Sequence, residues 1–362
     1  MTLDSGQVFH WEKVGNGFVG AIGDQALYVE QRGETVRIAI EGGAPATPGS
    51  QELAPPGKEL IERYFALDHP LAEIRASFPD DPIMGTARNF CRGLRIIRQP
   101  KWECLATFIC SSMKQVAHIR QISHALRKRF GDRRKIDNGA GGSRATWTGK
   151  AARVDEPGDE SINHVVYTFP RPQWLAQSSE KELRECALGY RARNLLATAR
   201  LVASGAVDLE AWSLLSDVDL REKLCDFPGV GTKVANCVML FAYERLRAFP
   251  IDVWIERVLK EKYFPRKRKV IPQRLRAFCE SYFGEYGGYA QQYLFHHARK
   301  SSRNSGTPRD FSTPLRSDRN DKGRDVRTSS RKSRTPRDSS PLGMAAAGQA
   351  TRPGMTKKGM LE

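Results

Sequence analysis

Residues 224–237 read Leu-Cys-Asp-Phe-Pro-Gly-Val-Gly-Thr-Lys-Val-Ala-Asn-Cys, and an apolar segment then leads to Phe-Pro-Ile-Asp at residues 249–252. The Pro-Gly-Val-Gly turn lies between two segments with helical periodicity, which predicts a helix–hairpin–helix unit. Glycine tolerates positive φ and lets the backbone approach a ligand closely, so Gly229 and Gly231 suit such a hairpin. Its N–H groups, beside a helix N-terminus, favour a phosphate oxygen.

The stretch from Gly229 to Lys233 could also be taken for part of a nucleotide-binding P-loop. That loop has four residues between its glycines and follows a strand. Here a single residue separates the glycines and a helical pattern precedes them, so we do not expect nucleotide binding.

Two charged residues flank the apolar segment, Lys233 at the start of one helix and Asp252 at the start of the next. The positive end of the helix dipole and partial burial both disfavour an ammonium group, which would free the Lys233 amine as a nucleophile. The alternative is a surface lysine that touches a DNA phosphate, and the residues alone leave both open. Asp252 could cap its helix, and its carboxylate could also stabilise positive charge at a sugar carbon.

The chain changes its periodicity near residue 57, which predicts an α+β fold with an N-terminal antiparallel β-sheet followed by a mostly helical body. Residues 18–22, 26–30 and 35–40 alternate apolar and polar side chains between turns. Residues 133–160 suggest a surface loop or a short hairpin. Helices are expected at 58–66, 70–77, 84–91, 101–130 (broken at Ser111-Ser112), 172–177, 180–186, 191–203, 208–213, 217–224, 233–246, 252–262, 271–283 and 286–299.

We expect three parts: an N-terminal β-sheet domain with accessory helices (1–98), a helical domain (99–300) and a basic disordered tail (301–362). The tail is rich in Ser, Arg and Pro and cannot bury enough apolar surface to fold. Residues 299–362 hold 16 Lys and Arg against six Asp and Glu, so +10 of the net charge of +17 lies there. The tail either adds a weak, salt-sensitive attraction to DNA or is a solvated extension without a specific role.

The seven cysteines are scattered and show no metal-ligand spacing, which predicts free thiols in a reducing compartment and no metal. No secretion signal and no apolar run near 18 residues is visible, so we expect a soluble intracellular protein without membrane contact. We expect a monomer without a cofactor, located in the cytoplasm or nucleoid of a bacterium or in the nucleus of a eukaryote.

Around Lys233 and Asp252 the chain resembles the helix–hairpin–helix, Gly/Pro-Asp superfamily of DNA glycosylases, most closely its 8-oxoguanine DNA glycosylase/AP lyase branch. Further stretches that carry the resemblance are Ser-Gly-Gln-Val-Phe-His-Trp (5–11), Arg-Ile-Ile-Arg-Gln (95–99), Trp-Glu-Cys-Leu-Ala-Thr-Phe-Ile-Cys-Ser-Ser (102–112), Leu-Gly-Tyr-Arg-Ala-Arg (188–193) and Tyr-Ala-Gln-Gln-Tyr-Leu-Phe (289–295). Iron–sulfur branches of the superfamily carry four cysteines after the aspartate. Only Cys279 follows Asp252 here, so that cofactor is not expected.

The resemblance implies a bifunctional enzyme of base excision repair that removes 8-oxoguanine and related oxidised purines from double-stranded DNA. The damaged base would be flipped into a pocket. Lys233 would attack C1′ and expel the base, giving a Schiff base whose β-elimination nicks the strand, while Asp252 supports charge at C1′.

The resemblance also assigns a base pocket to Gly6, Cys237, Gln291 and Phe295. The carbonyl of Gly6 would accept the N7 hydrogen that distinguishes 8-oxoguanine from guanine. Phe295 would stack on the base opposite Cys237, and Gln291 would bond its Watson–Crick edge. The residues alone allow simpler interpretations: a turn for Gly6, core positions for Phe295 and Cys237, and a surface amide for Gln291.

Tyr190 resembles the family's wedge residue, and Arg191 resembles its reader of the orphaned cytosine. Two departures predict relaxed discrimination of the base opposite the lesion. Met113 begins a run that is asparagine-rich in the family, and His118 stands at the position of a second cytosine-reading arginine. Two more departures, Trp254 and Ala298, stand where the family has a phosphate-contacting histidine and its aspartate partner.

Two other functions remain as alternatives. A non-catalytic helix–hairpin–helix DNA-binding module would use the hairpin without the lysine chemistry. A glycosylase for alkylated bases is disfavoured, because such enzymes usually lack a lysine at position 233.

Overall fold

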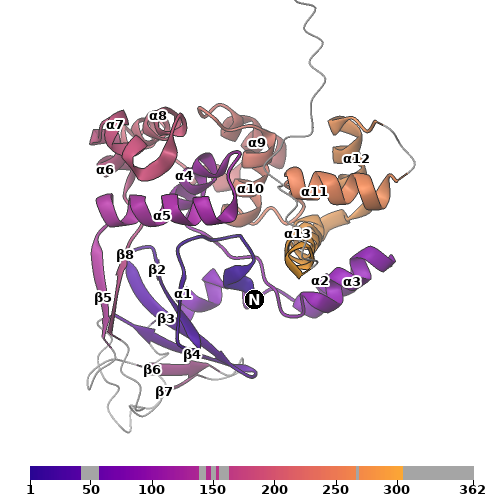
Figure 1. Cartoon of the computed structure of the whole chain (residues 1–362), viewed down its shortest axis with the longest axis horizontal. Coiled ribbons are helices and arrows are strands. Elements are labelled where there is room, and N and C mark those ends of the chain that lie inside the picture. Colours follow the sequence, from indigo (N-terminus) through magenta and orange to yellow (C-terminus); the bar gives the residue numbers. More distant parts are fainter. Residues whose placement is uncertain (42–56, 138–143, 148–151, 155–162, 266–268, 305–362) are drawn as a thin grey trace, which may run out of the picture. The chain divides into compact units, whose positions relative to one another are not determined.

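The N-terminal sheet has six antiparallel strands in the order β1-β2-β3-β4-β6-β7 (Figure 1). The computed structural model describes residues 1–41, 57–137, 144–147, 152–154, 163–265 and 269–304. The predicted disordered tail (301–362) lies outside the described residues from 305 on, and residues 301–304 instead belong to the last helix. A separate pair is formed by β5 and β8. The strands are β1 (Glu12–Val14), β2 (Gly17–Ile22), β3 (Gln25–Arg32), β4 (Thr35–Ile40), β5 (Arg133–Asp137), β6 (Arg144–Trp147), β7 (Ala152–Val154) and β8 (Asn163–Tyr167).

The two faces of the sheet bury alternate side chains against different neighbours, as the period of two requires. Leu27 and Val29 of β3 belong to a cluster with Ile61 of α1 (Lys58–Tyr64). Ala26 and Tyr28 point to the other face, in a cluster that includes residues of β5 and β8. Cover on both faces explains why β2 and the middle of β3 are almost wholly buried.

For residues 133–160 the sequence suggested a surface loop or a short hairpin. The short hairpin is present as β6 and β7, and β6 pairs with β4, so the hairpin extends the N-terminal sheet. Pairing satisfies the backbone groups that β4 would otherwise expose at the sheet edge. Four-residue strands such as β6 carry too little periodicity to show this in the sequence.

The helical body agrees with the predicted α+β fold, with differences at several helix ends. The predicted helix over 208–213 is a short 3₁₀ turn, η3 (Ala211–Leu214), and the helix predicted over 233–246 ends at Ala242. Glu244 has φ 55°, a left-handed conformation that cannot continue a helix. The remaining elements are α2 (Leu71–Ala76), α3 (Pro82–Phe90), α4 (Lys101–Ser111), α5 (Val116–Phe130), α6 (Pro172–Gln177), α7 (Glu180–Leu183), η2 (Arg184–Leu188), α8 (Arg191–Ala203), α9 (Asp217–Cys225), α10 (Thr232–Ala242), α11 (Val253–Val258), η4 (Leu259–Tyr263), α12 (Pro272–Tyr282) and α13 (Gly287–Asn304).

A single large core holds the helices together. Helix α4 is buried from Glu103 to Ser111 and packs against α8 and α10. Ile74 and Met84, from α2 and α3, belong to the same core. The predicted domain division at residue 98 stays a prediction. Helices α2 and α3 precede that residue in sequence, yet their side chains pack into the helical core.

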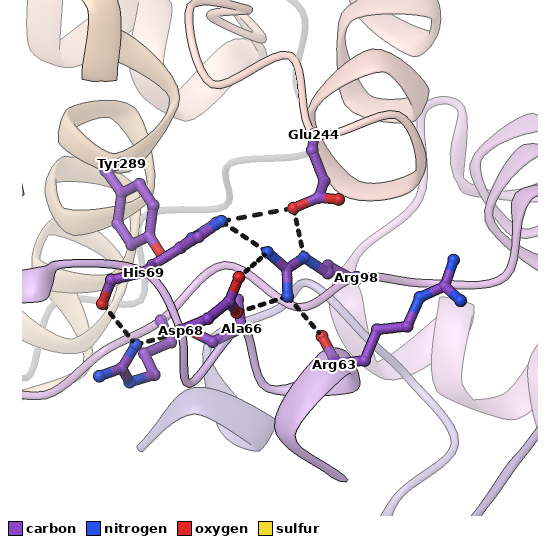
Figure 2. Close-up of polar contacts among 8 residues, drawn as sticks. Arg63, Ala66, Asp68, His69, Arg98, Glu244 and Tyr289 are labelled. Atoms are coloured by element: carbon purple, nitrogen blue, oxygen red, sulfur yellow. Dashed lines mark hydrogen bonds and ion pairs between the residues drawn. The ribbon is translucent and has the colours of Figure 1, made fainter. Parts of the chain in front are cut away.

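A polar cluster fixes the C-terminal end of α10, and Figure 2 shows Arg98 at its centre. Arg98 donates to both carboxylate oxygens of Asp68, at 2.6 and 2.7 Å, and to the Glu244 carboxylate. His69 lies 3.3 Å from Glu244 and is hydrogen-bonded to the Tyr289 hydroxyl at 2.8 Å. We call these five residues the Arg98 cluster. It ties the segment after α1 to α10 and α13, the two helices that carry most of the site described below.

Replacing Arg98 with Met should lower the free energy of unfolding by about 2 kcal/mol, because Glu244 and Asp68 lose a shared, mostly buried donor. Urea unfolding followed by circular dichroism measures the change. Arg184→Met is the matched control, since Arg184 forms an exposed pair with Glu180 one helical turn away. That variant should lose less than about 0.5 kcal/mol. Equal midpoints for the two variants would show that the Arg98 cluster contributes no stability.

Candidate active site

A cleft of about 930 Å³ opens between the N-terminal segment, the α4–α5 turn and helices α10, α11 and α13. It brings together residues that are far apart in sequence. The predicted site residues that line it are Gly6, Met113, Lys233, Cys237, Asp252, Gln291 and Phe295. Tyr190, Arg191, His118, Gly229 and Gly231 do not line it.

Lys233 is the second residue of α10, and its side chain is half-buried. Its Nζ lies 5.3 Å from the centroid of the Phe108 ring, and that ring stacks on Phe241 at 5.5 Å. Cys237 follows one turn later and is buried, which raises the pKa of its thiol although the nearby Lys233 lowers it in part. The amine therefore lies in the cleft over an aromatic floor, in surroundings of low polarity.

Asp252 is the N-cap of α11, as the sequence suggested. Its Oδ1 accepts a hydrogen bond of 2.8 Å from the backbone N–H of Ile255. Burial raises the pKa of this carboxyl above its ordinary value, and attraction to Lys233 and backbone N–H groups offset part of that shift. The capping role and a place in the cleft beside Lys233 therefore coexist.

Gly6 occupies a position that only glycine fits. Its φ is +94°, and an added Cβ would lie 2.6 Å from Nη1 of Arg299 and 3.0 Å from the Phe295 ring. The neighbouring residues hold the segment in place, since Gln7 donates to the Arg95 carbonyl at 2.8 Å and Gln292 donates to the Ser5 carbonyl at 3.3 Å. The backbone of Gly6 is thus fixed at the wall of the cleft.

Gln291 is buried at 4 % exposure, so its interpretation as a surface amide was wrong. Its Oε1 has no hydrogen-bond partner among the described residues. Buried polar atoms are nearly always paired in native proteins, and an exception at the wall of a cleft indicates an acceptor for a ligand. Phe295 and Cys237 belong to the helical core and also line the cleft, so both interpretations hold for them.

Several residues of the cleft were missed by the sequence analysis. Phe108 and Phe241 form its floor, and Arg299 lines its wall with Cζ 5.5 Å from the Phe295 ring centroid. Phe241 and Arg299 repeat the four-residue helical spacing that starts at Cys237 and Phe295, so the period could have found them. Arg299 also donates to the Asp4 carbonyl, which connects α13 with the N-terminal segment.

Four residues that the sequence placed at the DNA contact, Met113, His118, Tyr190 and Arg191, differ in their exposure. Met113 and Tyr190 are exposed, and the Tyr190 hydroxyl lies 3.9 Å from the Met113 sulfur. His118, near the start of α5, is exposed. Arg191 is buried and donates to the backbone carbonyls of Ser112 and Leu188.

The two hairpin glycines differ. Gly229 has φ +81°, and an added Cβ would collide with the side chain of Asn194. Gly231 is the N-cap of α10 with φ −107°, and open space surrounds its Cβ position. Gly229 therefore uses the positive φ that glycine permits, whereas the exposed backbone of Gly231 leaves room for a ligand above the start of α10.

No group of three or more His, Cys, Asp or Glu side chains that could hold a metal ion occurs in the part of the chain that the structure describes. In that same part, none of the helices combines the length and the apolar character that crossing a bilayer requires.

Two family models match consecutive parts of the chain. The one described as 8-oxoguanine DNA glycosylase, N-terminal domain, matches residues 1–105. The one described as HhH-GPD superfamily base excision DNA repair protein matches residues 107–281. Together they cover the sheet, the hairpin, Lys233 and Asp252.

Curated proteins with similar sequences carry related names. The chain is 29 % identical over 309 residues to N-glycosylase/DNA lyase OGG1 of Arabidopsis thaliana, covering 82 % of this chain and 75 % of that protein. It is 28 % identical over 334 residues to the N-glycosylase/DNA lyase of Saccharomyces cerevisiae, covering 81 % of each.

Solved structures of 8-oxoguanine glycosylases are similar to this chain as well. A Clostridium acetobutylicum 8-oxoguanine glycosylase/lyase, in complex with double-stranded DNA containing cytosine opposite 8-oxoguanine, superposes with a TM-score of 0.67 at 28 % identity, over 83 % of this chain and 91 % of that one. MBOgg1 in complex with a low-affinity DNA ligand gives a TM-score of 0.68 at 29 % identity with the same coverage.

The contrast between the two glycines predicts different effects of adding a methyl group. Gly229→Ala should lower the free energy of unfolding by about 1–3 kcal/mol, because the residue is left-handed and crowded. Gly231→Ala should change it by less than about 0.5 kcal/mol, since its conformation suits alanine. Urea unfolding measures both values.

Gly231→Ala should nevertheless weaken DNA binding, because the methyl group intrudes on the exposed backbone where a phosphate would approach. Fluorescence anisotropy with a labelled duplex measures the affinity. Equal stability of the two variants would contradict the hairpin geometry. An unchanged affinity of Gly231→Ala for DNA would show that no phosphate contacts the backbone at this position.

Proposed function

Because this chain belongs to the 8-oxoguanine DNA glycosylase/AP lyase family of the helix–hairpin–helix Gly/Pro-Asp superfamily, we propose that it excises 8-oxoguanine from double-stranded DNA and then nicks the strand at the abasic site. One observation in the chain carries the proposal: the amine of Lys233 and the carboxylate of Asp252 face a single cleft that also contains the unpaired acceptor of Gln291.

The proposed chemistry begins when the damaged nucleotide leaves the duplex and its base enters the cleft. The uncharged amine of Lys233 forms a bond to C1′ while the C1′–N9 bond breaks and its electron pair departs with the base. The carboxylate of Asp252 stabilises the positive charge that develops on the sugar. Its position as a helix cap holds it still, so no reorganisation is needed as that charge appears.

Strand cleavage follows from the same covalent bond. Opening of the sugar ring turns the amine adduct into a protonated Schiff base between Lys233 and C1′. Loss of a proton from C2′ then expels the 3′ phosphate, because the iminium accepts the electron pair. Water releases the lysine by hydrolysis, and no metal or redox cofactor takes part in any of these steps.

Recognition of the base uses groups whose places the fold fixes. The carbonyl of Gly6 accepts the N7 hydrogen of 8-oxoguanine, which guanine lacks. The Oε1 of Gln291 accepts from the donors on the Watson–Crick edge, and this hydrogen bond satisfies an atom that is otherwise buried and unpaired. The ring of Phe295 and the thiol of Cys237 enclose the two faces of the base. Since all these groups come from one chain, we propose that the enzyme acts as a monomer.

Borohydride should trap a covalent complex between the protein and an 8-oxoguanine duplex, because it reduces the Schiff base. Lys233→Gln should give no trapped complex and lose both activities, as measured by gel electrophoresis of labelled DNA. Lys114→Gln is the matched control, since Lys114 also lines the cleft and should still be trapped. A trapped complex at full yield in Lys233→Gln would contradict the mechanism. If the native protein bound DNA without nicking it, the alternative of a non-catalytic DNA-binding module would hold.

The raised pKa of Asp252 predicts the acid side of the pH–rate profile. A raised pKa means that the carboxyl takes up its proton at a higher pH than an ordinary aspartate does. As the pH is lowered, the single-turnover excision rate should therefore begin to fall at a higher pH than the pH at which ordinary carboxylates take up protons. Asp252→Asn should be slower at neutral pH and should lack this inflection. An inflection that persists unchanged in Asp252→Asn would assign it to another group.

A further inference from the structure

Helix α13 presents three different side chains to the cleft, one helical turn apart. Gln291, Phe295 and Arg299 repeat at the four-residue spacing that places side chains on one face of a helix, and all three line the cleft. The amide of Gln291 and the ring of Phe295 have a use in the proposed function, as contacts to the base. The guanidinium of Arg299, at the end of this row, has not been given one.

Arg299 lies in the wall of the cleft against the backbone of Gly6. An added Cβ on Gly6 would lie 2.6 Å from Nη1 of Arg299, and Cζ of Arg299 lies 5.5 Å from the Phe295 ring centroid. The side chain is only 6 % exposed, so its guanidinium is placed for a group inside the cleft more than for a phosphate outside it. Arg299 therefore stands at the end of the cleft where Gly6 and Phe295 would hold the base.

The N-terminal segment fixes the direction of this guanidinium. Nη2 of Arg299 donates to the backbone carbonyl of Asp4, two residues before Gly6. Gln292, on the same helix, donates to the Ser5 carbonyl at 3.3 Å, and the N-terminus of the chain lies beside α13 (Figure 1). A donor fixed in this way needs little reorganisation when negative charge appears beside it.

The positive charge of Arg299 acts on its surroundings in the free protein. His296 is 3 % exposed, and its pKa is lowered to about 4, first by burial and then by the charges of Arg299 and Lys300, although Asp4 opposes the shift. A guanidinium does not lose its proton in proteins. The wall of the cleft beside Gly6 therefore carries a positive charge at neutral pH.

Cleavage of the C1′–N9 bond produces a negative charge that such a cation can stabilise. The electron pair of that bond departs with the base, and the charge spreads from N9 through C8 to the oxygen O8. In 8-oxoguanine, C8 is bonded to both N7 and N9. A base whose N7–H meets the Gly6 carbonyl therefore directs O8 toward the wall beside Gly6, where Arg299 stands.

We propose that Arg299 is a further catalytic residue, whose guanidinium donates to O8 of the flipped base and stabilises the negative charge on the base as the C1′–N9 bond breaks. The inference rests on the proposed function and adds a group that acts on the leaving base, whereas Asp252 acts on the sugar. The guanidinium keeps its proton, and the base anion takes up a proton from water after it has left. Guanine carries a hydrogen atom at C8 and lacks this contact.

The test compares a reaction that expels a base with one that does not. Single-turnover rates are measured for excision of 8-oxoguanine, by gel electrophoresis after alkali treatment, and for nicking of the same duplex with a preformed abasic site. Arg299→Met should lower the ratio of the excision rate to the nicking rate by at least about tenfold, since loss of one donor aimed at a developing negative charge slows other enzymes by about 10²-fold or more. This ratio does not depend on how much of a variant folds.

Two further variants separate the charge of Arg299 from its bulk and from the charge of the whole protein. Arg299→Lys keeps the charge without the planar fork, so it should retain more of the ratio than Arg299→Met. Arg184→Met is the matched control, because it makes the same chemical change in an exposed ion pair with Glu180. Both of its rates should stay near the native values.

The outcomes separate this inference from the proposed function. A native protein that excises 8-oxoguanine and nicks the abasic site establishes the proposed function, whatever Arg299 does. In such a protein, a ratio for Arg299→Met that falls by less than about tenfold overturns the role of Arg299, because similar losses in both rates mean that it only holds the wall of the cleft. Equal ratios for Arg299→Lys and Arg299→Met also overturn it, since the charge then has no effect. A native protein inactive in both assays overturns the proposed function and this inference with it.

Discussion

The proposed chemistry of this protein depends on the contact between one amine and an aromatic floor. Lys233 lies over Phe108, which stacks on Phe241, and these rings come from α4 and α10. Both helices are held by core packing along their length, and the backbone N–H of Gln99 donates to the Phe241 carbonyl at 2.7 Å. The Arg98 cluster fixes the chain just beyond this point. The surroundings of the amine are therefore a product of the core, and changes far from the cleft can reach it.

A second set of contacts couples the base pocket to the N-terminal segment. Asp4 accepts from Arg120 at 2.9 Å and from Lys300 at 2.7 Å, and its backbone carbonyl accepts from Arg299. These cationic neighbours lower the pKa of Asp4 although burial opposes the shift. The segment that carries Gly6 is thus clamped between α5 and α13. Under the proposed function, discrimination between 8-oxoguanine and guanine rests on the Gly6 carbonyl, and this clamp fixes the segment that carries it.

The sequence predicted the sheet, the order of helices and the capping role of Asp252, because each rests on local periodicity or on a short motif. It did not predict the state of Arg191, whose partner Ser112 is 79 residues away. For the same reason the residues alone left a surface amide open as an alternative for Gln291, since burial there depends on packing between distant segments. The motif also could not tell which of the two glycines needs a positive φ: Gly229 does, whereas Gly231 at the start of α10 is extended.

The free protein carries several unfavourable features that duplex DNA would relieve together. The acceptor of Gln291 is buried without a partner in the described structure, Met113 is strained, and Met113 and Tyr190 expose apolar surface. Each raises the free energy of the unbound state: the Gln291 acceptor lacks a hydrogen bond, the Met113 backbone is left-handed, and the exposed apolar groups are hydrated. Under the proposed function, a flipped base would give the Gln291 acceptor a donor, and duplex DNA would cover the exposed apolar side chains. Packing around the cleft keeps these features in place, so under the proposed function binding energy would go into extruding the base.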